Sequence, residues 1–289
     1  MYIGRFAPSP TGPLHFGSLV TAVASYLDAR SKQGKWLLRM EDLDKQREVK
    51  GAASNIFSTL KTYGFYWDDA VIYQSQRKDI YERALAKLKV MQHIYPCTCT
   101  RKEIADSSEQ TGIEGVIYPK TCLHQTIKAN HPVAWRIKTP DKSILFKDVI
   151  QGHIEQNLSK QIGDFVLKRA DGQFAYQLAV VVDDAEQGIT NVVRGADLLN
   201  STTRQIYIQK LLGYTQPTYM HIPIVKNKLG QKLSKQTLAA PIDIGESSRT
   251  LWQALAFLNQ NPPQSLKHKT IDQLWKWAIP NWQANIIHR

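Results

Sequence analysis

Near its start the chain reads Gly4-Arg5-Phe6-Ala7-Pro8-Ser9-Pro10-Thr11-Gly12-Pro13-Leu14-His15-Phe16-Gly17-Ser18. The β-prone run 2–6 comes first, and the prolines and glycines that follow it exclude regular structure. From Ser18 onward, apolar residues recur at helical spacing at Leu19, Val20, Val23, Tyr26 and Leu27. This stretch therefore predicts a strand, a tight turn and a helix, which together form the first unit of an α/β fold.

The rest of the chain continues this alternation on both sides of an interruption. The patterns predict strands at 36–40 and 191–195, and helices near 48–63, 77–91 and 201–212. Alternating strands and helices favour a parallel sheet with right-handed crossovers. We therefore expect a first core half at 1–92, an insertion at 93–150, a second core half at 151–239, and a short helical C-terminal region at 240–289 whose helices are separated at 261–263 and 279–280.

The composition is that of a soluble globular protein, with 43% hydrophobic and 21% charged residues among 289. No apolar run is long enough to span a bilayer, and Met1 leads straight into the first motif without a signal peptide, so we expect a cytoplasmic protein and no membrane partner. The net charge of +12 is uneven, because residues 201–289 hold 11 Lys and Arg against 3 Asp and Glu. Such a basic region favours a polyanionic partner, although a basic surface also serves solubility alone.

Two short motifs are candidates for binding a nucleotide, since the chain has neither a P-loop nor a G-x-G-x-x-G fingerprint. His15 and Gly17 stand at the predicted start of a helix, where backbone N–H groups attract phosphate and a residue without Cβ lets a ligand approach. Lys232 and Lys235 follow Gly230 in a polar loop, and both can point at a triphosphate. Taken singly, the first motif also fits a helix-capping histidine and the second a solvated basic turn.

Taken together and in this order, the two motifs resemble the HIGH region and the KMSKS loop of class I aminoacyl-tRNA synthetases, and their surroundings resemble glutamyl-tRNA synthetases. The resemblance covers residues 1 to about 240 and implies a class I synthetase-type Rossmann core, with a parallel sheet and helices. It implies that His15, Lys232 and Lys235 are catalytic and that His15, Gly17, Ser18 and Lys235 bind ATP with Mg²⁺. Lys235 matches the lysine that stabilises the leaving pyrophosphate.

Small departures from the family motifs accompany this resemblance. Phe16 replaces the usual Ile, Ser18 replaces the last His, Leu233 replaces Met, and Gln236 is less usual at the final position. These changes bear on the subfamily more than on the chemistry.

A glutamate pocket needs an acidic residue for the ammonium group and arginine for a bidentate grip on a carboxylate. Arg5, Glu41, Tyr176 and Arg194 all lie beside predicted strand ends, where α/β folds bind ligands. Glu41 also fits an acidic loop, and Arg194 also fits an ion pair with Asp197.

The resemblance implies that the segment from Arg5 through Phe6, Ala7, Pro8 and Ser9 lines the L-glutamate, that Glu41 takes its ammonium group, and that Tyr176 and Arg194 help to hold it. Arg194 within the segment 193–197 matches the glutamyl pattern rather than the glutaminyl one.

All three cysteines lie in the expected insertion, at Cys97, Cys99 and Cys122. In a cytosolic chain an odd, clustered set favours a metal over a disulfide, and zinc prefers four ligands. A set of three buried free thiols is the alternative. The resemblance to zinc-binding glutamyl-type synthetases implies Tyr118 as an unusual fourth ligand of a structural Zn²⁺. On the residues alone, His93 and His124 compete with it.

The chain ends at Arg289, soon after the second motif, and we expect no anticodon-binding domain. A full catalytic core without such a domain resembles the truncated paralogue family, the glutamyl-queuosine tRNA(Asp) synthetases. That resemblance implies a ligase that activates glutamate with ATP, without tRNA, and esterifies it onto queuosine in the anticodon loop of tRNA(Asp). The rival hypotheses are a shortened glutamyl-tRNA synthetase that charges a 3′ end, a non-catalytic RNA-binding paralogue, and an enzyme that passes activated glutamate to another acceptor. We expect a monomer.

Overall fold

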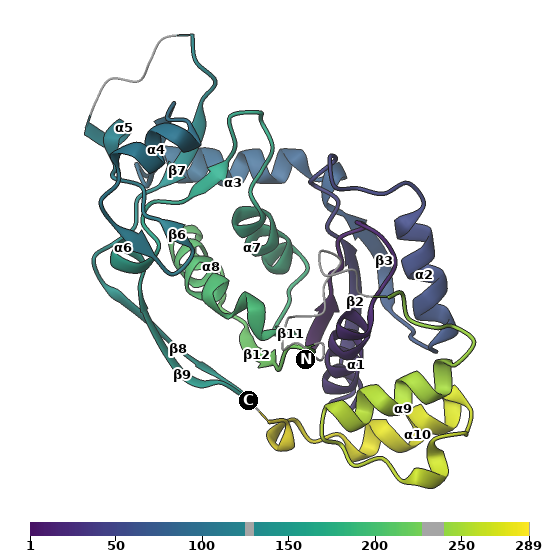
Figure 1. Ribbon diagram of the computed structural model, residues 1–289. Helices are drawn as coiled ribbons and strands as arrows, with labels where there is room; N and C mark the ends of the chain where they lie inside the picture. The colour runs from purple at the N-terminus through teal and green to yellow at the C-terminus, as the bar shows by residue number, and fades with distance from the viewer. Residues whose placement is uncertain (125–129, 227–239, 289) are drawn as a thin grey trace.

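The computed structural model describes residues 1–124, 130–226 and 240–288. Two groups of parallel strands meet at its centre (Figure 1). In the first group β2 (Lys35–Met40) lies between β1 (Ile3–Phe6) and β3 (Asp68–Tyr73), and both pairings are parallel. In the second group β11 (Asn191–Gly195) pairs in parallel with β12 (Thr218–Ile222). The predicted α/β core with a parallel sheet is confirmed.

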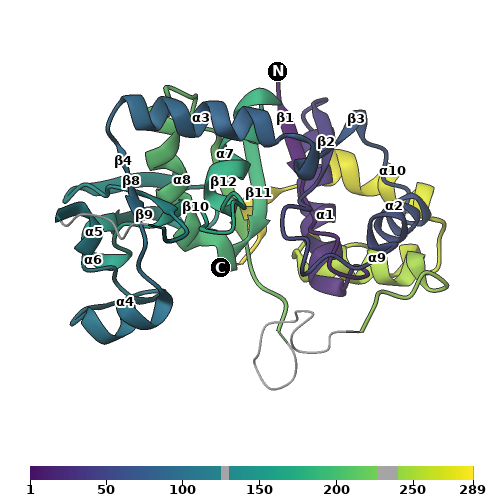
Figure 2. The ribbon, with the colours of Figure 1, turned by 90° about the horizontal axis from the view of Figure 1, so that it is seen from above.

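The two strand groups lie side by side at β1 and β11. The backbone N–H of Thr190 donates to the carbonyl of Ile3 over 2.9 Å, and α1 (Phe16–Arg30) contacts both strands. Seen from above, β1 to β3 with α1 and α2 (Ala52–Thr62) form one side, and β11 and β12 with α7 (Tyr176–Glu186) and α8 (Leu199–Leu212) form the other (Figure 2). Residues from the two halves of the chain therefore come together where β1 lies beside β11.

Predicted helix starts shift by a few residues. Helix α1 begins at Phe16 rather than Ser18, because the His15 side chain accepts a hydrogen bond from the Ser18 N–H and caps the helix. Helix α2 begins at Ala52 rather than near 48, because Gly51 precedes it with a φ of 81°, which is not helical. Helix α3 (Lys78–Val90) lies close to its predicted range.

The inserted region supplies two strands of a small antiparallel sheet, β4 (Ile94–Cys97) and β7 (Ala134–Ile137), and β10 (Val166–Lys168), which follows the insertion, pairs with the other edge of β7. Around it lie five short elements: α4 (Arg101–Ser107), β5 (Thr111–Gly112), β6 (Gly115–Val116), α5 (Thr121–His124) and α6 (Leu158–Gln161). The hairpin of β8 (Ser143–Asp148) and β9 (Gly152–Asn157) continues the second parallel group through a β12–β8 pairing. The boundary expected at 150 thus falls within a paired hairpin.

The C-terminal region consists of α9 (Ser247–Phe257) and α10 (Ile271–Asn281), which lie beside α1 in Figure 1. Four short 3₁₀ turns complete the described elements: Gln74–Gln76, Ala196–Leu198, Gln264–Leu266 and Ala284–Ile286. The break predicted at 279–280 is wrong, because Pro280 lies in the last turn of α10, where few backbone hydrogen bonds remain to be lost.

An aromatic core ties this region to the first strands. Trp36 is fully buried on β2 and stacks on Phe6 and Phe65, with ring centroids 6.2 and 5.5 Å away. Trp275 of α10 contacts Phe65 and Tyr26 over 5.1 and 4.9 Å. Aromatic pairs of this kind contribute about 0.5–1.5 kcal/mol each beyond the area they bury. Among the described residues, no helix is long and apolar enough to cross a membrane.

Candidate active site

The residues predicted to bind the amino acid lie where neighbouring parallel strands end. Arg5 is on β1, Glu41 directly follows β2, and Arg194 is on β11. The carboxyl ends of parallel strands meet at one edge of a sheet, so these three residues converge from distant parts of the chain. Tyr176 does not follow a strand end as expected. It is the first residue of helix α7, and its hydroxyl lies 3.5 Å from Nη1 of Arg194.

A buried carboxylate joins the first two strands to α7. Asp184 accepts from Arg5, through Nε at 3.2 Å and Nη2 at 3.4 Å, and from Arg39 Nη1 at 2.8 Å. Burial acts to raise the pKa of Asp184, but the charges of Arg5 and Arg39 outweigh it and hold that pKa below its usual range. Asp184 is therefore a charged anchor between the two halves of the core.

Arg39 also reaches the predicted ammonium-binding residue. Its Nη2 donates to Oε1 of Glu41 over 3.3 Å, and its own side chain is fully buried. Burial raises the pKa of Glu41, although Arg39 and Arg5 oppose that shift. Glu41 is thus held in place by one long hydrogen bond, and its remaining acceptor capacity is available to a ligand.

Asp183 precedes Asp184 in α7, and its carboxylate accepts hydrogen bonds from a second group of side chains. Its carboxylate accepts from Gln74, Arg77 and Tyr81 over 2.7, 2.7 and 2.8 Å, and it lies 3.8 Å from Arg39 Nε. The start of α3 is thereby tied to α7 behind the pocket.

Arg194 differs from Arg5 and Arg39 because its hydrogen-bond partners among the described residues are all neutral. Its Nε donates to Nε2 of His221 at 3.0 Å and its Nη2 to Oγ1 of Thr202 at 2.8 Å, while Nη1 lies 3.5 Å from the hydroxyl of Tyr176. In the described part of the chain no carboxylate forms an ion pair with Arg194, so the alternative pairing with Asp197 is not formed. A buried guanidinium without a counterion is suited to bind an anionic group.

Tyr176 is partly buried and lies near these charged groups. Burial raises the pKa of its hydroxyl, and the charges of Arg194, Glu41, Arg5 and Asp184 all act on it. The phenol is therefore neutral and can donate or accept a hydrogen bond at the pocket.

The segment 6–9 follows the same edge with differing exposure. The Phe6 side chain is in the core, which leaves only its main chain for a ligand. Ala7 and Pro8 are half-buried and Ser9 is exposed, and the carbonyl of Pro8 accepts from the Glu41 N–H at 3.0 Å.

The predicted nucleotide residues gather at the start of α1. Nδ1 of His15 accepts from the Ser18 N–H at 3.3 Å, and Nε2 lies 3.1 Å from the Ser18 hydroxyl. A Cβ at Gly17 would lie 3.2 Å from Cε1 of His15, which is tighter than an ordinary contact. The first turn of α1 holds no acidic residue, so the positive end of the helix dipole is uncompensated there.

Lys232 and Lys235 lie outside the described residues, but the chain on both sides of 227–239 is placed. A Cβ at Gly17 would lie 3.7 Å from Cβ of Val225. On the other side the Ile242 N–H donates to the carbonyl of Leu14 over 3.0 Å. Described residues on either side of 227–239, Val225 and Ile242, thus lie next to the start of α1.

The three cysteines of the insertion converge with Tyr118. The sulfurs of Cys97, Cys99 and Cys122 lie within 4.8 Å of one another, and Cys99 Sγ is 3.4 Å from Cys122 Sγ. The Tyr118 hydroxyl lies 3.4 Å from Cys97 Sγ and 3.5 Å from Cys99 Sγ. Sulfurs on one tetrahedral zinc lie about 3.8 Å apart, so this donor set fits the ion with little movement. Among the described residues the metal-type cluster contains neither His93 nor His124.

Hydrogen bonds and burial give Cys99 and Cys122 different thiol pKa values. Burial acts to raise the pKa of Cys122, but hydrogen bonds involving Tyr118 and the Thr98 backbone outweigh it and bring the pKa to about 6. Burial raises the pKa of Cys99 to about 11. A ligand set with one readily formed thiolate is suited to capture a cation.

Comparisons with known proteins place this arrangement in a family. Residues 3–259 match the family of class I tRNA synthetases (E and Q), catalytic domain. The chain is 52% identical over 289 residues to a glutamyl-Q tRNA(Asp) synthetase of Aromatoleum aromaticum, covering 100% of this chain and 91% of that relative. It is 51% identical over 289 residues to the enzyme of the same name from Dechloromonas aromatica, covering 96% of that relative. The chain belongs to the glutamyl-Q tRNA(Asp) synthetase family.

A solved structure is similar over nearly the whole of this family member. It is a glutamate tRNA ligase from Elizabethkingia meningosepticum in complex with its amino acid, with a TM-score of 0.78 and 26% sequence identity. The match covers 99% of this chain but only 66% of that ligase. The fold of the glutamyl-Q synthetase family member is thus that of a class I synthetase catalytic core.

Sequence reasoning missed the residues behind the pocket. They are Arg39, Asp148, Asp183, Asp184 and His221. One signal was present, because Asp183 and Asp184 directly follow the apolar run 178–182, and a charge within a buried segment requires a partner.

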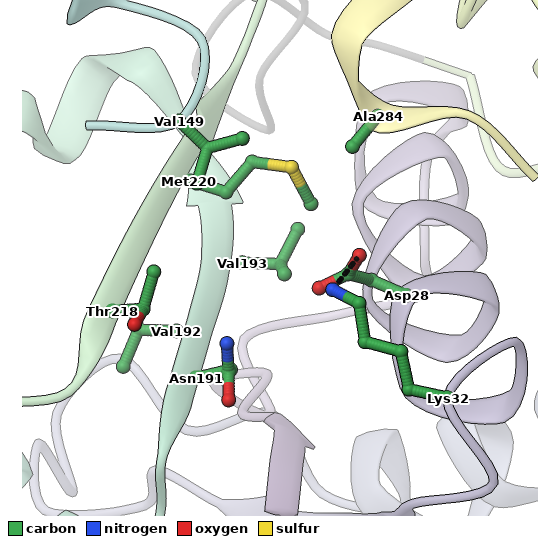
Figure 3. Close-up of a pocket in the computed structure, with 9 residues that line it drawn as sticks. All are labelled: Asp28, Lys32, Val149, Asn191, Val192, Val193, Thr218, Met220 and Ala284. Carbon is green, nitrogen blue, oxygen red and sulfur yellow. Dashed lines mark hydrogen bonds and ion pairs between the residues drawn. The ribbon is translucent and has the colours of Figure 1, made fainter. Parts of the chain in front are cut away.

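A separate small cavity lies at the opposite ends of the same strands (Figure 3). It holds about 60 Å³ and is bordered by the first residues of β11 and β12, Asn191 and Thr218, and by the ion pair of Asp28 with Lys32. Arg194 and Glu41 do not line it. This cavity is therefore distinct from the predicted amino-acid site.

Proposed function

We propose that this protein activates L-glutamate with ATP, without tRNA, and transfers the glutamyl group to queuosine in the anticodon loop of tRNA(Asp). The relatives at 51–52% identity carry the name of that activity. The observation that carries the choice of amino acid is Arg194, a buried guanidinium whose described partners are all neutral.

The pocket offers complementary charges for each end of glutamate. Glu41 binds the α-ammonium group, and Arg194 binds the side-chain carboxylate in a bidentate manner with help from the Tyr176 hydroxyl. Arg5 adds positive charge at the same edge while Asp184 holds it in place. A glutamine amide would bring N–H donors against the donors of Arg194, so the geometry favours glutamate.

Activation requires positioning and charge stabilisation more than acid–base chemistry. An oxygen of the α-carboxylate attacks the α-phosphorus of ATP, the bond to the β-phosphate oxygen breaks, and pyrophosphate leaves. Mg²⁺ enters with ATP as part of the substrate and neutralises phosphate charge. His15 and the start of α1 hold phosphate oxygens, and Lys235 stabilises the leaving pyrophosphate.

Transfer then needs only a nucleophile that reaches the activated carbonyl. A ring hydroxyl of queuosine attacks the acyl carbon, its proton is lost, and AMP leaves with the phosphate oxygen. We propose that the zinc-bearing insertion and the basic residues of 201–289 flank the anticodon stem and contact its phosphates. A single chain supplies every residue of the pocket, so we propose that the protein acts as a monomer.

We also propose one structural zinc in the insertion, bound by Cys97, Cys99, Tyr118 and Cys122. When bound, the ion cross-links β4 to α5 and takes no part in the chemistry, because the nucleotide and glutamate residues lie on other elements.

The decisive experiment follows labelled glutamate. ATP–pyrophosphate exchange should proceed with glutamate alone, and a synthetic anticodon hairpin carrying queuosine should accept the label nearly as well as whole tRNA. The same hairpin carrying guanosine should accept none. If the hairpin stays unlabelled while the 3′ end of intact tRNA is charged, the protein is a glutamyl-tRNA synthetase and this proposal is wrong.

A further inference from the structure

Behind Arg194 lies a second buried pair that the activation chemistry does not use. Nδ1 of His221 is 2.6 Å from Oδ2 of Asp148, and both side chains are fully buried. Oδ1 of Asp148 accepts from the N–H groups of Ile150, Gln151 and His221 over 3.0, 2.9 and 3.2 Å. Asp148 ends β8 and His221 is on β12, so this pair connects two strands beneath the pocket.

The proton on the imidazole is fixed by its neighbours. A guanidinium has only donors, so Nε2 of His221, 3.0 Å from Arg194 Nε, must be the acceptor. The ring proton is then on Nδ1 and is donated to Asp148. A second proton, on Nε2, would face the guanidinium of Arg194 and be repelled by its positive charge. The buried imidazole of His221 is therefore neutral.

The hydrogen bonds from Arg194 to His221 and Thr202 determine which N–H groups of its guanidinium remain available to a ligand. Nε is used by His221 and one proton of Nη2 by Thr202, whereas the contacts of Nη1 with Tyr176 and of Nη2 with the Leu198 carbonyl are long, at 3.5 Å each. Hydrogen bonds at that length are weak. Arg194 therefore keeps donors on both Nη atoms that a carboxylate can engage.

We propose that Asp148 and His221 are positioning residues for glutamate selection. Asp148 fixes the His221 ring so that the lone pair of its Nε2 accepts from Nε of Arg194, and this hydrogen bond orients the Nη atoms of Arg194 toward the substrate carboxylate. This inference rests on the proposed glutamate-activating function. Neither residue touches the substrate. His221 Nε2 also lies 3.1 Å from the hydroxyl of Thr202, which itself accepts from Arg194 Nη2, so both contacts act on Arg194. Their effect therefore concerns the binding of the amino acid and not that of ATP.

Asp148→Asn tests the inference with almost no change of shape. The Asn oxygen can keep the three backbone donors, and its NH₂ group then faces Nδ1 of His221. The ring must move its proton to Nε2, which now points at the N–H of Arg194. Loss of one charge-assisted hydrogen bond should raise KM for glutamate about 10- to 100-fold, with kcat changed far less and KM for ATP unchanged. The preference for glutamate over glutamine in pyrophosphate exchange should fall by a similar factor.

A control and a direct readout accompany this variant. Asp164→Asn alters an equally buried carboxylate, which accepts from Thr139 and Tyr95 in the insertion, and it should leave KM for glutamate unchanged. Nitrogen-15 NMR of labelled histidine should show the His221 proton on Nδ1 in the wild type and on Nε2 in Asp148→Asn.

A second pair of variants covers the case in which Asp148→Asn does not fold. His221→Gln can return an acceptor oxygen toward Arg194, whereas His221→Leu cannot, so only the leucine variant should lose glutamate affinity. If the wild type shows no glutamate-dependent exchange, the proposed function fails. If the wild type is active and a folded Asp148→Asn with reversed tautomer, or His221→Leu, keeps the wild-type KM for glutamate, the inference is wrong.

Discussion

Replacing Asp184 with asparagine should strongly destabilise the protein. This carboxylate accepts from Arg5 and Arg39, its side chain is 8% exposed, and those of the two arginines are 4% and 0% exposed. The substituted side chain would leave both guanidinium groups without their shared counterion and would turn one NH₂ group toward them. Removing one partner of such a buried charge cluster costs about 3–5 kcal/mol.

The matched control is an ion pair with the same chemistry at the surface. Asp171 lies 2.7 Å from Arg169, and both side chains are more than 40% exposed. Asp171→Asn should cost less than about 1 kcal/mol, because water screens the pair. In thermal unfolding the buried variant should lose about 6–20 °C, at roughly 2–4 °C per kcal/mol, and the surface variant only a few degrees.

The effect of Asp184→Asn on stability should also depend on pH in a definite direction. The folded pKa of Asp184 is below its unfolded value of about 3.9, so its stabilisation is fully present above that pH and is lost as pH falls through the folded pKa. The stability gap between wild type and Asp184→Asn should therefore narrow in acid. Urea unfolding at pH 7 and near pH 3 measures the gap. A variant within 1 kcal/mol of wild type at pH 7 would refute the idea that this carboxylate holds the core halves together.

Three further changes test the nucleotide and metal assignments. Lys235→Ala should lower turnover about 10²–10³-fold, the usual loss for one positioned charge stabiliser, and a loss below threefold in exchange assays would exclude contact with the phosphates. Gly17→Ala should raise KM for ATP because its Cβ would press on the His15 ring at 3.2 Å, while circular dichroism stays unchanged; an unaltered KM would contradict the packing. Elemental analysis should find one zinc per chain, lost in Cys97→Ser but retained in His124→Ala, and the reverse pattern would reassign the ligands.

Much of the fold could be predicted because the signals are local. The segment 191–195 predicted β11 to the residue, and the stretch from Gly4 to Ser18 predicted β1, its turn and α1. By contrast, β12 carries a polar Thr218 and a buried His221 in five residues and shows no clear alternation. Its strand character comes from parallel pairing with β11, which sequence periodicity does not report.

In the candidate site, too, some residues could be predicted from local sequence and others could not. Residues that would face the substrate stand next to strand ends and could be selected one by one, as with Arg5, Glu41 and Arg194. Their partners could not, because Asp184 is 179 positions from Arg5 and 145 from Arg39, and His221 is 73 positions from Asp148. Which carboxylate neutralises which arginine depends on how helices and strands pack, and no local pattern encodes it.

That distribution of partners explains why the pocket should require an acidic amino acid. Arg5 and Arg39 share Asp184, and Arg39 also reaches Glu41, so the charges on that side are nearly balanced within the protein. On the other side the pair of Asp148 and His221 offers Arg194 a neutral acceptor. A substrate side chain without negative charge would leave this guanidinium buried and unpaired, at a cost that a carboxylate removes. In the proposed binding mode, selectivity for glutamate would therefore arise because no described residue supplies a counterion to Arg194, so that the substrate carboxylate takes that role.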